Sequence, residues 1–439
     1  MRINFLVLAY FACFAMKLMA QNPICPIGTY LADPTARVWS DGRLYIYGST
    51  DEDLSYWCSY EQDVLYTSDL KEWHVKPDVF ASKGAKDQVA GTDALLFASD
   101  AMYKDGQYLL YFCTPDKSFS EGVAASDSPL GPFTNGKKIT TTKYNQIDPT
   151  VFIDDDGQAY YYWGQGKMKG AKMKADMLDI DTTSIVDDLI NAKDEYFHEG
   201  AFVFKRKDLY YVVYAHHGRR GRPTCLGYAI SKSPLGPFEY KGVVIDNFGS
   251  DPTVWNNHGS IAKFKDQWYV FYHRPSHNSR VMRRTCMEPI KFNPDGTIDE
   301  VEMTSQGAAE PLSAYKKIDA ERACLLKGTC YIEFVHSGNE VLRGISNNDC
   351  ASYKYIDFGK GANEFSASIA PQEGGSINIR IDSPQGKIIG TLTVPSSDVS
   401  DAFRRYKCKI DKTKGVHALF LEFKSKESTL FEVDEFNFQ

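Results

Sequence analysis

A hairpin pattern that occurs five times in the first 272 residues is the feature that most constrains this fold. Each copy has an apolar strand, a turn with charged residues or glycine, and a second strand dense in tyrosine and aliphatic residues. Three copies begin with an acidic residue: Asp33 in LADPTARVW, Asp148 in IDPTVFIDDDG and Glu199 in HEGAFVF. The copies around Tyr103 and His258 have no such acid. Hairpins repeated at intervals of roughly 50 to 70 residues predict a five-bladed β-propeller.

The repeat also predicts that the three acids lie close together. In a propeller the innermost strands of all blades begin around one axis, so residues in the same slot of different blades meet. A second repeat supports this architecture, because the hexapeptide SPLGPF occurs at 128–133 and again at 233–238. Each copy follows a short strand, as expected for the same outer turn in two blades.

The chain of 439 residues is too long for one ordinary core and is expected to form two domains. The aromatic hairpin pattern predicts a propeller over residues 21–316. Short alternating strands with Gly and Pro turns then predict a β-sandwich of the jelly-roll kind over residues 317–439. The whole chain is therefore expected to be all-β. Only Asp176 to Ile190 hints at a helix, expected as a loop decoration.

The N-terminal residues and the charge restrict location and partners. Residues 1–20 are typical of a signal peptide, with Arg2, an apolar stretch too short to span a bilayer, and Leu-Met-Ala before Gln21. We therefore expect a secreted or periplasmic protein without a membrane span, and lipidation at Cys13 is the less favoured alternative because its flanking residues fit poorly. A net charge of −7 argues against nucleic-acid binding, which needs a basic face. A monomer is expected.

Cysteine usage predicts no metal centre. Nine cysteines follow the expected cleavage site, and none forms a CxxC motif or a Cys/His cluster of the zinc-binding kind. Several lie in strand-like runs, where a buried free thiol is the favoured interpretation. Export would permit disulfides, but the sequence assigns none.

Three converging carboxylates suit glycoside hydrolysis. One carboxylic acid protonates the leaving oxygen, and one carboxylate acts on the opposite face of the sugar. A third acid nearby favours the protonated form of the proton donor. The alternative is that Asp before Pro-Thr organises a turn. Asp251 begins a third Asp-Pro-Thr, so the tripeptide alone does not identify a site.

The three acid motifs, in their order and spacing, resemble glycoside hydrolase family 43, and the resemblance covers about residues 23–311. It implies an inverting enzyme with Asp33 as general base, Glu199 as general acid and Asp148 as the residue that tunes and orients the acid. An α-L-arabinofuranosidase acting on plant polysaccharide side chains is favoured, with β-xylosidase or an exo-acting galactan hydrolase as alternatives. A propeller lectin without catalysis and a retaining, fructan-type hydrolase are rivals of other kinds.

Further site residues follow from the same resemblance. His258 matches a histidine near a central calcium, and a hydrogen-bonded structural histidine is the equal alternative; the chemistry itself needs no cofactor. Arg283 matches a substrate-contacting arginine, and Arg284 is the alternative because neighbours in a strand point to opposite sides. Trp39, Trp163 and Phe97 could stack on a sugar or fill the space between blades.

The C-terminal part resembles carbohydrate-binding module family 6 over about residues 318–439. It departs from the family where ligands usually bind, because no Trp follows Trp268 and residues 433–436 read Val-Asp-Glu-Phe. Sugar binding and a structural role against the propeller therefore both stay open. Glu321 and Asp434 fall where that fold often holds a structural calcium. The expected partner of the whole chain is an oligo- or polysaccharide.

Overall fold

The structure is a computed structural model that describes residues 21–140, 146–335, 338–397, 402–425 and 430–439. Residues 1–20, the predicted signal peptide, lie outside the described residues. Within the described ranges the regular elements are β-strands and three turns of 3₁₀-helix: η1 (Gly84–Lys86), η2 (Thr182–Ser184) and η3 (Ala320–Arg322). The all-β prediction is thus confirmed. A search of the same ranges finds no helix of the length and apolarity that a membrane span requires.

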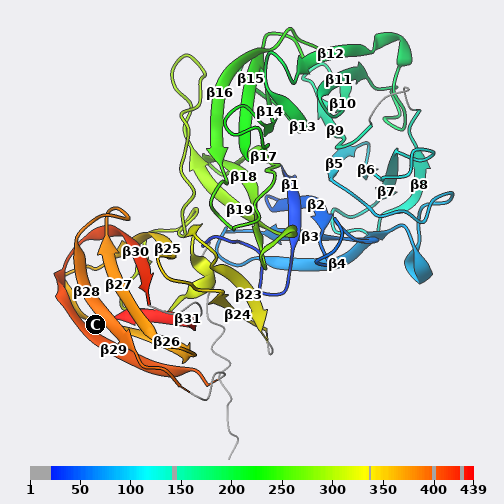
Figure 1. The fold of residues 1–439 in the computed structure, drawn as a ribbon. Coiled ribbons are helices and arrows are strands. Elements are labelled where there is room, and N and C mark those ends of the chain that lie inside the picture. Colours follow the sequence, from blue (N-terminus) through cyan, green and yellow to red (C-terminus); the bar gives the residue numbers. More distant parts are fainter. Residues whose placement is uncertain (1–20, 141–145, 336–337, 398–401, 426–429) are drawn as a thin grey trace, which may run out of the picture.

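Five antiparallel sheets follow one another along the chain, each made of consecutive strands (Figure 1). The first contains β1 (Leu31–Val38), β2 (Leu44–Thr50), β3 (Glu61–Thr67) and β4 (His74–Ala81). The second contains β5 (Ser99–Lys104), β6 (Gln107–Cys113), β7 (Glu121–Ser126) and β8 (Thr134–Lys138). The third contains β9 (Thr150–Ile153), β10 (Ala159–Trp163), β11 (Lys167–Lys172) and β12 (Val186–Asn191). The fourth contains β13 (Phe197–Arg206), β14 (Leu209–His216), β15 (Cys225–Ser231) and β16 (Glu239–Asp246). The fifth contains β17 (Ser260–Phe264), β18 (Gln267–Ser276) and β19 (Ser279–Ile290).

The five sheets close into a ring. Contacts between first strands run from β1 to β5, β9, β13 and β17 and back to β1, so these strands surround one axis. Apolar clusters fill the space between neighbouring sheets; one packs Tyr45 of the first sheet against Phe112 of the second. Another packs Ile46 of the first sheet against Phe271 of the fifth, which closes the ring. Alternating tyrosine and aliphatic residues supply both faces of these buried strands.

Two six-stranded sheets form the C-terminal part, and a large apolar core lies between them. One contains β20 (Leu312–Ser313), β22 (Leu325–Lys327), β25 (Cys350–Asp357), β27 (Gly375–Ile381), β28 (Ile388–Val394) and β30 (Val416–Lys424). The other contains β21 (Ile318–Asp319), β23 (Tyr331–Val335), β24 (Asn339–Arg343), β26 (Ala362–Pro371), β29 (Arg404–Thr413) and β31 (Phe431–Phe438). β20 pairs with β25, so the chain joins these sheets from Leu312 onwards. Figure 1 shows β23 and β24 on the side that faces the ring.

Residues 176–190 and the cysteines were the subject of two further predictions. The hint of a helix over residues 176–190 is wrong, because η2 occupies only one turn and β12 then forms the last strand of the third sheet. All nine cysteines of the described residues are free; eight are buried and Cys408 is partly buried. This agrees with the interpretation of these cysteines as buried free thiols.

Candidate active site

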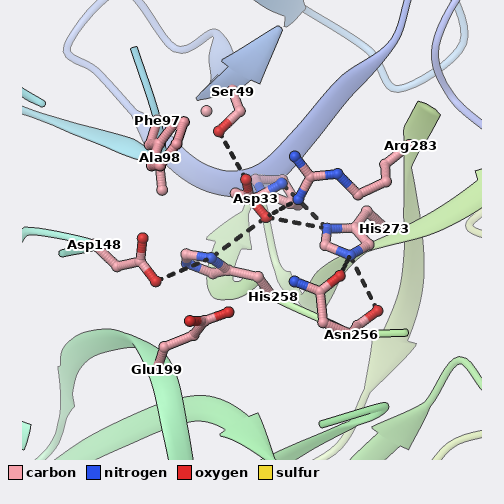
Figure 2. Close-up of polar contacts among 12 residues, drawn as sticks. Asp33, Ser49, Phe97, Ala98, Asp148, Glu199, Asn256, His258, His273 and Arg283 are labelled. Atoms are coloured by element: carbon pink, nitrogen blue, oxygen red, sulfur yellow. Dashed lines mark hydrogen bonds and ion pairs between the residues drawn. The ribbon is translucent and has the colours of Figure 1, made fainter. Parts of the chain in front are cut away.

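A pocket of about 270 Å³ opens at the axis of the ring, and Asp33, Asp148 and Glu199 all line it (Figure 2). Asp33 lies in β1, Asp148 lies two residues before β9, and Glu199 lies in β13. These are first strands of three different sheets, which is why residues so far apart in sequence meet. The predicted convergence of the three acids is confirmed.

The backbone at the two Asp-Pro pairs is in an uncommon conformation. Asp33 and Asp148 have φ values of 52° and 58°, whereas a residue before proline normally prefers the extended region. Such conformations are held by their surroundings and are frequent at functional sites. Asp251, which begins the third Asp-Pro-Thr, has no positive φ and lies outside the pocket, where its Oδ1 accepts a hydrogen bond from the backbone of Thr253. Asp-Pro-Thr therefore places an acid in the pocket at Asp33 and Asp148, and forms a local hydrogen-bonded turn at Asp251.

Asp33 is held as a carboxylate. Its Oδ1 lies 2.7 Å from Nη1 of Arg283, and its Oδ2 accepts a hydrogen bond of 2.7 Å from the Ser49 hydroxyl. Nδ1 of His258 and Nδ1 of His273 lie 3.5 and 3.4 Å from Oδ1. Burial alone would raise the pKa of Asp33, but Arg283 and the two imidazoles hold this pKa well below its usual range. Asp33 is thus ionised at neutral pH, as a base must be.

Arg283 is the pocket arginine, and Arg284 points the other way. Besides Asp33, Arg283 binds Asp51 through Nη2 and Nε, at 2.8 and 2.9 Å. Asp51 is 3% exposed and was not found by sequence reasoning, because it follows β2 outside the repeated slot. Arg284 forms a buried ion pair with Glu340 of the C-terminal part. Of the two arginines only Arg283 lines the pocket, and its contact with a substrate stays a prediction.

Asp148 is in a different electrostatic state from Asp33. Burial, followed by the nearby charges of Glu199 and Asp33, raises the pKa of Asp148 to about 8, although His258 acts in the opposite direction. Asp148 therefore carries a proton at neutral pH. An ionised Asp148 would be repelled by the charges of Glu199 and Asp33, so a proton on Asp148 relieves this repulsion.

Glu199 is the most solvent-accessible of the three acids, with 13% of its side chain exposed. Its Oε2 accepts a hydrogen bond of 2.7 Å from Nε2 of Gln165, and Nε2 of His198 lies 3.7 Å away. The next residue, Gly200, has a φ of +68°, and a Cβ there would lie 2.9 Å from the His258 ring. Only glycine lets the Glu199 strand pass so close to this imidazole.

His258 lies between two of the acids, Asp33 and Asp148. Its Nδ1 faces Asp33 and, at 3.9 Å, Oδ2 of Asp148. Burial would lower the pKa of His258, but the hydrogen bond to Asp33 and the charges of both aspartates raise it. Across the described residues no three His, Cys, Asp or Glu side chains gather in a way that could hold a metal ion. Calcium at His258 stays a prediction, and the geometry around it is that of the alternative, a hydrogen-bonded histidine.

A structural calcium at Glu321 and Asp434 in the C-terminal part also stays a prediction. Glu321 is buried and Asp434 accepts a hydrogen bond from Asn339, and neither belongs to a candidate ligand group among the described residues.

Of the three predicted stacking residues, only Phe97 lines the pocket. Trp163 is fully buried beside Tyr161 between the second and third sheets. Trp39 packs between the first and second sheets, and its Nε1 donates to the hydroxyl of Tyr47. Neither Trp39 nor Trp163 lines this pocket; both fill space between sheets, as in the alternative that the sequence left open.

Two other tryptophans, Trp57 and Trp255, line the pocket instead. The Arg283 guanidinium lies 4.6 Å from the ring centre of Trp57. Trp255 is 39% exposed, with Arg222 5.8 Å from its ring centre. Both residues lie between strands, where the repeat gives no register, and only the closeness of Trp255 to His258 in sequence could have pointed to it.

Comparison with known proteins gives two matches to protein families. The sequence model of "Glycosyl hydrolases family 43" matches residues 20–298, and that of "Carbohydrate binding module (family 6)" matches residues 319–439. The chain is 30% identical to an arabinoxylan arabinofuranohydrolase of Bacillus subtilis strain 168, over 93% of this chain and 90% of that protein. It is also 30% identical to a β-xylosidase of Xylanibacter ruminicola, over 62% of this chain and 97% of that protein.

Solved structures agree with the sequence relatives. The crystal structure of a family 43 arabinoxylan arabinofuranohydrolase from Bacillus subtilis, in complex with cellotetraose, matches with a TM-score of 0.57 and 27% identity. The match covers 96% of this chain and 99% of that one. A β-xylosidase/α-arabinofuranosidase from a compost metagenome, solved with xylotriose in a calcium-free form, matches with a TM-score of 0.56 and 28% identity, over 65% of this chain and 98% of that one.

Proposed function

Because the chain belongs to glycoside hydrolase family 43 and is a glycoside hydrolase, we propose that it removes terminal α-L-arabinofuranosyl groups from plant polysaccharide with inversion of configuration. The observation that carries the proposal is the difference in surroundings between two acids of the pocket. Asp33 is a carboxylate fixed by Arg283, whereas Glu199 is the acid nearest to solvent. An inverting hydrolase needs one base and one acid in these different roles.

In the proposed mechanism, a water molecule attacks the anomeric carbon and gives its proton to Asp33. The bond to the leaving oxygen breaks at the same time, and that oxygen takes a proton from Glu199. The raised pKa values of Asp148 and His258 favour their protonated forms, which limits the negative charge beside Asp33 and Glu199. The cycle ends when Asp33 returns its proton to solvent and Glu199 takes up another.

The pocket supports exo action on a single sugar unit. A volume of about 270 Å³ lies below the usual range of roughly 300–1,000 Å³ for pockets that take drug-sized ligands. Trp57 and Trp255 provide aromatic faces against which sugar rings can pack. The remainder of the polysaccharide then lies outside the pocket, on the surface around its mouth.

The relatives favour arabinofuranose as the sugar and keep xylose as the alternative. Two of them, from Bacillus subtilis and Paenibacillus polymyxa, are arabinoxylan arabinofuranohydrolases that match this chain over 93% of its length. A xylosidase/arabinosidase of Thermoclostridium stercorarium matches over 94%. Double specificity for α-arabinofuranosides and β-xylosides is therefore the second candidate function.

We also propose the finer architecture and the location. The five sheets are interpreted as the blades of a five-bladed propeller, and the two C-terminal sheets as a jelly-roll. The signal-like residues 1–20 support secretion or export to the periplasm, and a monomer remains our expectation for the mature protein.

The test is a panel of aryl glycosides: α-L-arabinofuranoside, β-D-xyloside and β-D-galactoside. We expect the α-L-arabinofuranoside to have the highest kcat/KM, and Glu199→Gln to abolish most turnover of an alkyl arabinofuranoside while ligand binding, measured by calorimetry, is retained. Absence of turnover on all three glycosides and on arabinan, xylan and galactan would overturn the proposal.

A further inference from the structure

The turn between β10 and β11 reaches into the pocket with the side chain of Gln165. Its Nε2 donates a hydrogen bond of 2.7 Å to Oε2 of Glu199, so the donor comes from the third sheet and the acceptor from the fourth. Gln165 is exposed at the pocket rim and is part of its lining. Nothing in the repeat predicts this residue, because it occupies a turn.

The backbone of the same turn is tied to both neighbouring acid segments. Gly164 N donates to the carbonyl of Ile147, the residue before Asp148, at 3.0 Å. Gly166 N donates to the carbonyl of His198, the residue before Glu199, at 2.7 Å. The tripeptide 164–166 therefore bridges the segments that carry two of the three acids.

Gly164 is needed for the turn to take this course. Its φ is +124°, and a Cβ at this position would lie 2.2 Å from the carbonyl oxygen of Lys167. A side chain at Gly164 would therefore displace the turn together with Gln165. A turn held at both ends and shaped by a glycine fixes the direction of the side chain that it presents.

We propose that Gln165 is a positioning residue for the acid, which holds Oε2 of Glu199 as an acceptor so that the transferable proton lies on Oε1. The proposal rests on the proposed function, in which Glu199 is the general acid. The carbonyl oxygen of a protonated carboxyl group is a better acceptor than its hydroxyl oxygen, so the hydrogen bond from Gln165 favours Oε2 as the unprotonated oxygen. The remaining oxygen then carries the proton toward the leaving group.

A neutral amide suits this task better than a cation. A Lys or Arg in the same place would strongly favour the ionised carboxylate and remove the proton before it is needed. The amide carries no charge and does not titrate, so it orients the acid and favours the ionised form much less than a cation would. It also stabilises the carboxylate that forms after proton transfer, when its hydrogen bond becomes charge-assisted.

The experiment compares Gln165→Met, which keeps the size of the side chain but lacks the donor, with wild type. Lys167→Gln is the matched control in the same turn, since Lys167 is exposed and pairs with Asp188. Two substrates are used: an alkyl α-L-arabinofuranoside, whose poor leaving group needs the acid, and a 2,4-dinitrophenyl arabinofuranoside, whose leaving group does not.

We expect Gln165→Met to lower kcat about 10-fold on the alkyl glycoside and less than about twofold on the dinitrophenyl glycoside, with KM little changed. The alkaline limb of the pH profile should move to higher pH, because the ionised carboxylate has lost a donor. Equal losses on both substrates, or no loss, together with an unmoved pH profile, would overturn the inference.

A second measurement does not depend on turnover. Carbon-13 NMR of the glutamate side-chain carboxyls, with the Glu199 signal assigned by its absence in Glu199→Gln, follows the titration directly. Its midpoint should move to higher pH in Gln165→Met and stay in place in Lys167→Gln; an unmoved midpoint contradicts the inference. If instead Glu199→Gln keeps wild-type activity on the alkyl glycoside, the proposed function itself fails.

Discussion

Two buried ionic clusters lie on opposite sides of β19, and they differ in how their charges are matched. On the pocket side Arg283 binds Asp33 and Asp51, while Asp148 lies 3.9 Å from the imidazole of His258, which also contacts Asp33. On the other side Arg284 forms an ion pair with Glu340, in a closed junction with the C-terminal part. Adjacent residues in one strand thus serve an open site and a closed interface.

The pocket cluster has the perturbed acids that catalysis requires, whereas the junction cluster holds the two parts of the chain together. Buried charges are costly unless they are paired, and the pocket tolerates carboxyl groups in excess over cations, with strongly perturbed pKa values. In the junction the Arg284–Glu340 pair is buried, and Tyr30 donates a further hydrogen bond to Glu340. In the same junction His277 N donates to the carbonyl of Ile332, across the two parts of the chain.

The C-terminal part packs against the ring of sheets. Its strands β23 and β24 supply the residues that meet β18 and β19, directly behind the pocket arginine. A structural role against the ring of sheets is therefore supported, whereas sugar binding by this part stays open.

The largest expected effect is on the pocket side. Asp33→Asn removes the proposed base and should lower kcat by about 10³-fold or more, measured on an aryl arabinofuranoside. Asp251→Asn is the matched control, because it changes the same Asp-Pro-Thr motif outside the pocket. It should keep activity within about twofold, since it alters no group that contacts the reacting atoms. A comparable loss in Asp251→Asn would mean that the motif acts through folding.

On the junction side we expect a loss of stability. Glu340→Gln leaves the buried Arg284 without its counter-charge and should lower the free energy of unfolding by about 3–5 kcal/mol, measured by urea denaturation. Glu300→Gln breaks the exposed pair with Arg219 and should cost less than about 1 kcal/mol. Equal costs for the two variants would show that the junction pair contributes no more than a surface pair.

Glu121, a carboxyl without a cation behind Asp148, should give stability a pH dependence. It is fully buried, its Oε2 accepts from the hydroxyl of Tyr161, and burial raises its pKa to about 8. Because this pKa exceeds that of the unfolded chain, the folded state binds more protons between about pH 4.5 and pH 8. The free energy of unfolding therefore falls as pH rises through that window, by on the order of a few kcal/mol.

Glu121→Gln removes this titration and should make the profile less steep, measured by chemical denaturation at a series of pH values; Asp148, whose pKa is also raised to about 8, keeps its own contribution. The variant should gain stability relative to wild type at pH 8 and not at pH 4.5. A profile that keeps its slope would mean that Glu121 ionises normally in the folded protein.

The smallest expected effect is on substrate affinity, and it should differ between Trp255 in the pocket and Trp163 between the sheets. Trp255→Ala should raise KM for an arabinoxylan oligosaccharide about 3- to 10-fold, since an aromatic contact contributes on the order of 1 kcal/mol, with kcat nearly unchanged. Trp163→Phe should leave KM unchanged and lower the free energy of unfolding by about 1–3 kcal/mol, because Trp163 is buried between sheets. The reverse pattern would place the stacking residue at Trp163 after all.

Sequence reasoning succeeded where the repeat supplied a register. Asp33, Asp148 and Glu199 share one slot of the hairpin pattern, and closure of the ring brings equivalent slots together. Alternation along the strand implied that only one of Arg283 and Arg284 faces the pocket, and the family resemblance favoured Arg283.

Residues in turns and irregular segments could not be found in this way. Trp57, Trp255 and Gln165 lie between strands, so their direction depends on loop conformation. Trp163 was misplaced for a related reason: it ends a strand whose aromatic residues fill the space between sheets. The last strand of the third sheet, β12, was missed because its short polar sequence has no clear alternation.

The central claim is that Asp33 and Glu199 act as base and acid in a single displacement, and the anomeric configuration of the first-formed product tests it most directly. Proton NMR of an α-L-arabinofuranoside hydrolysed at high enzyme concentration resolves this product before it mutarotates. We predict β-L-arabinofuranose, the inverted anomer, as the initial product. Initial formation of the α anomer would indicate a covalent intermediate and would contradict the account.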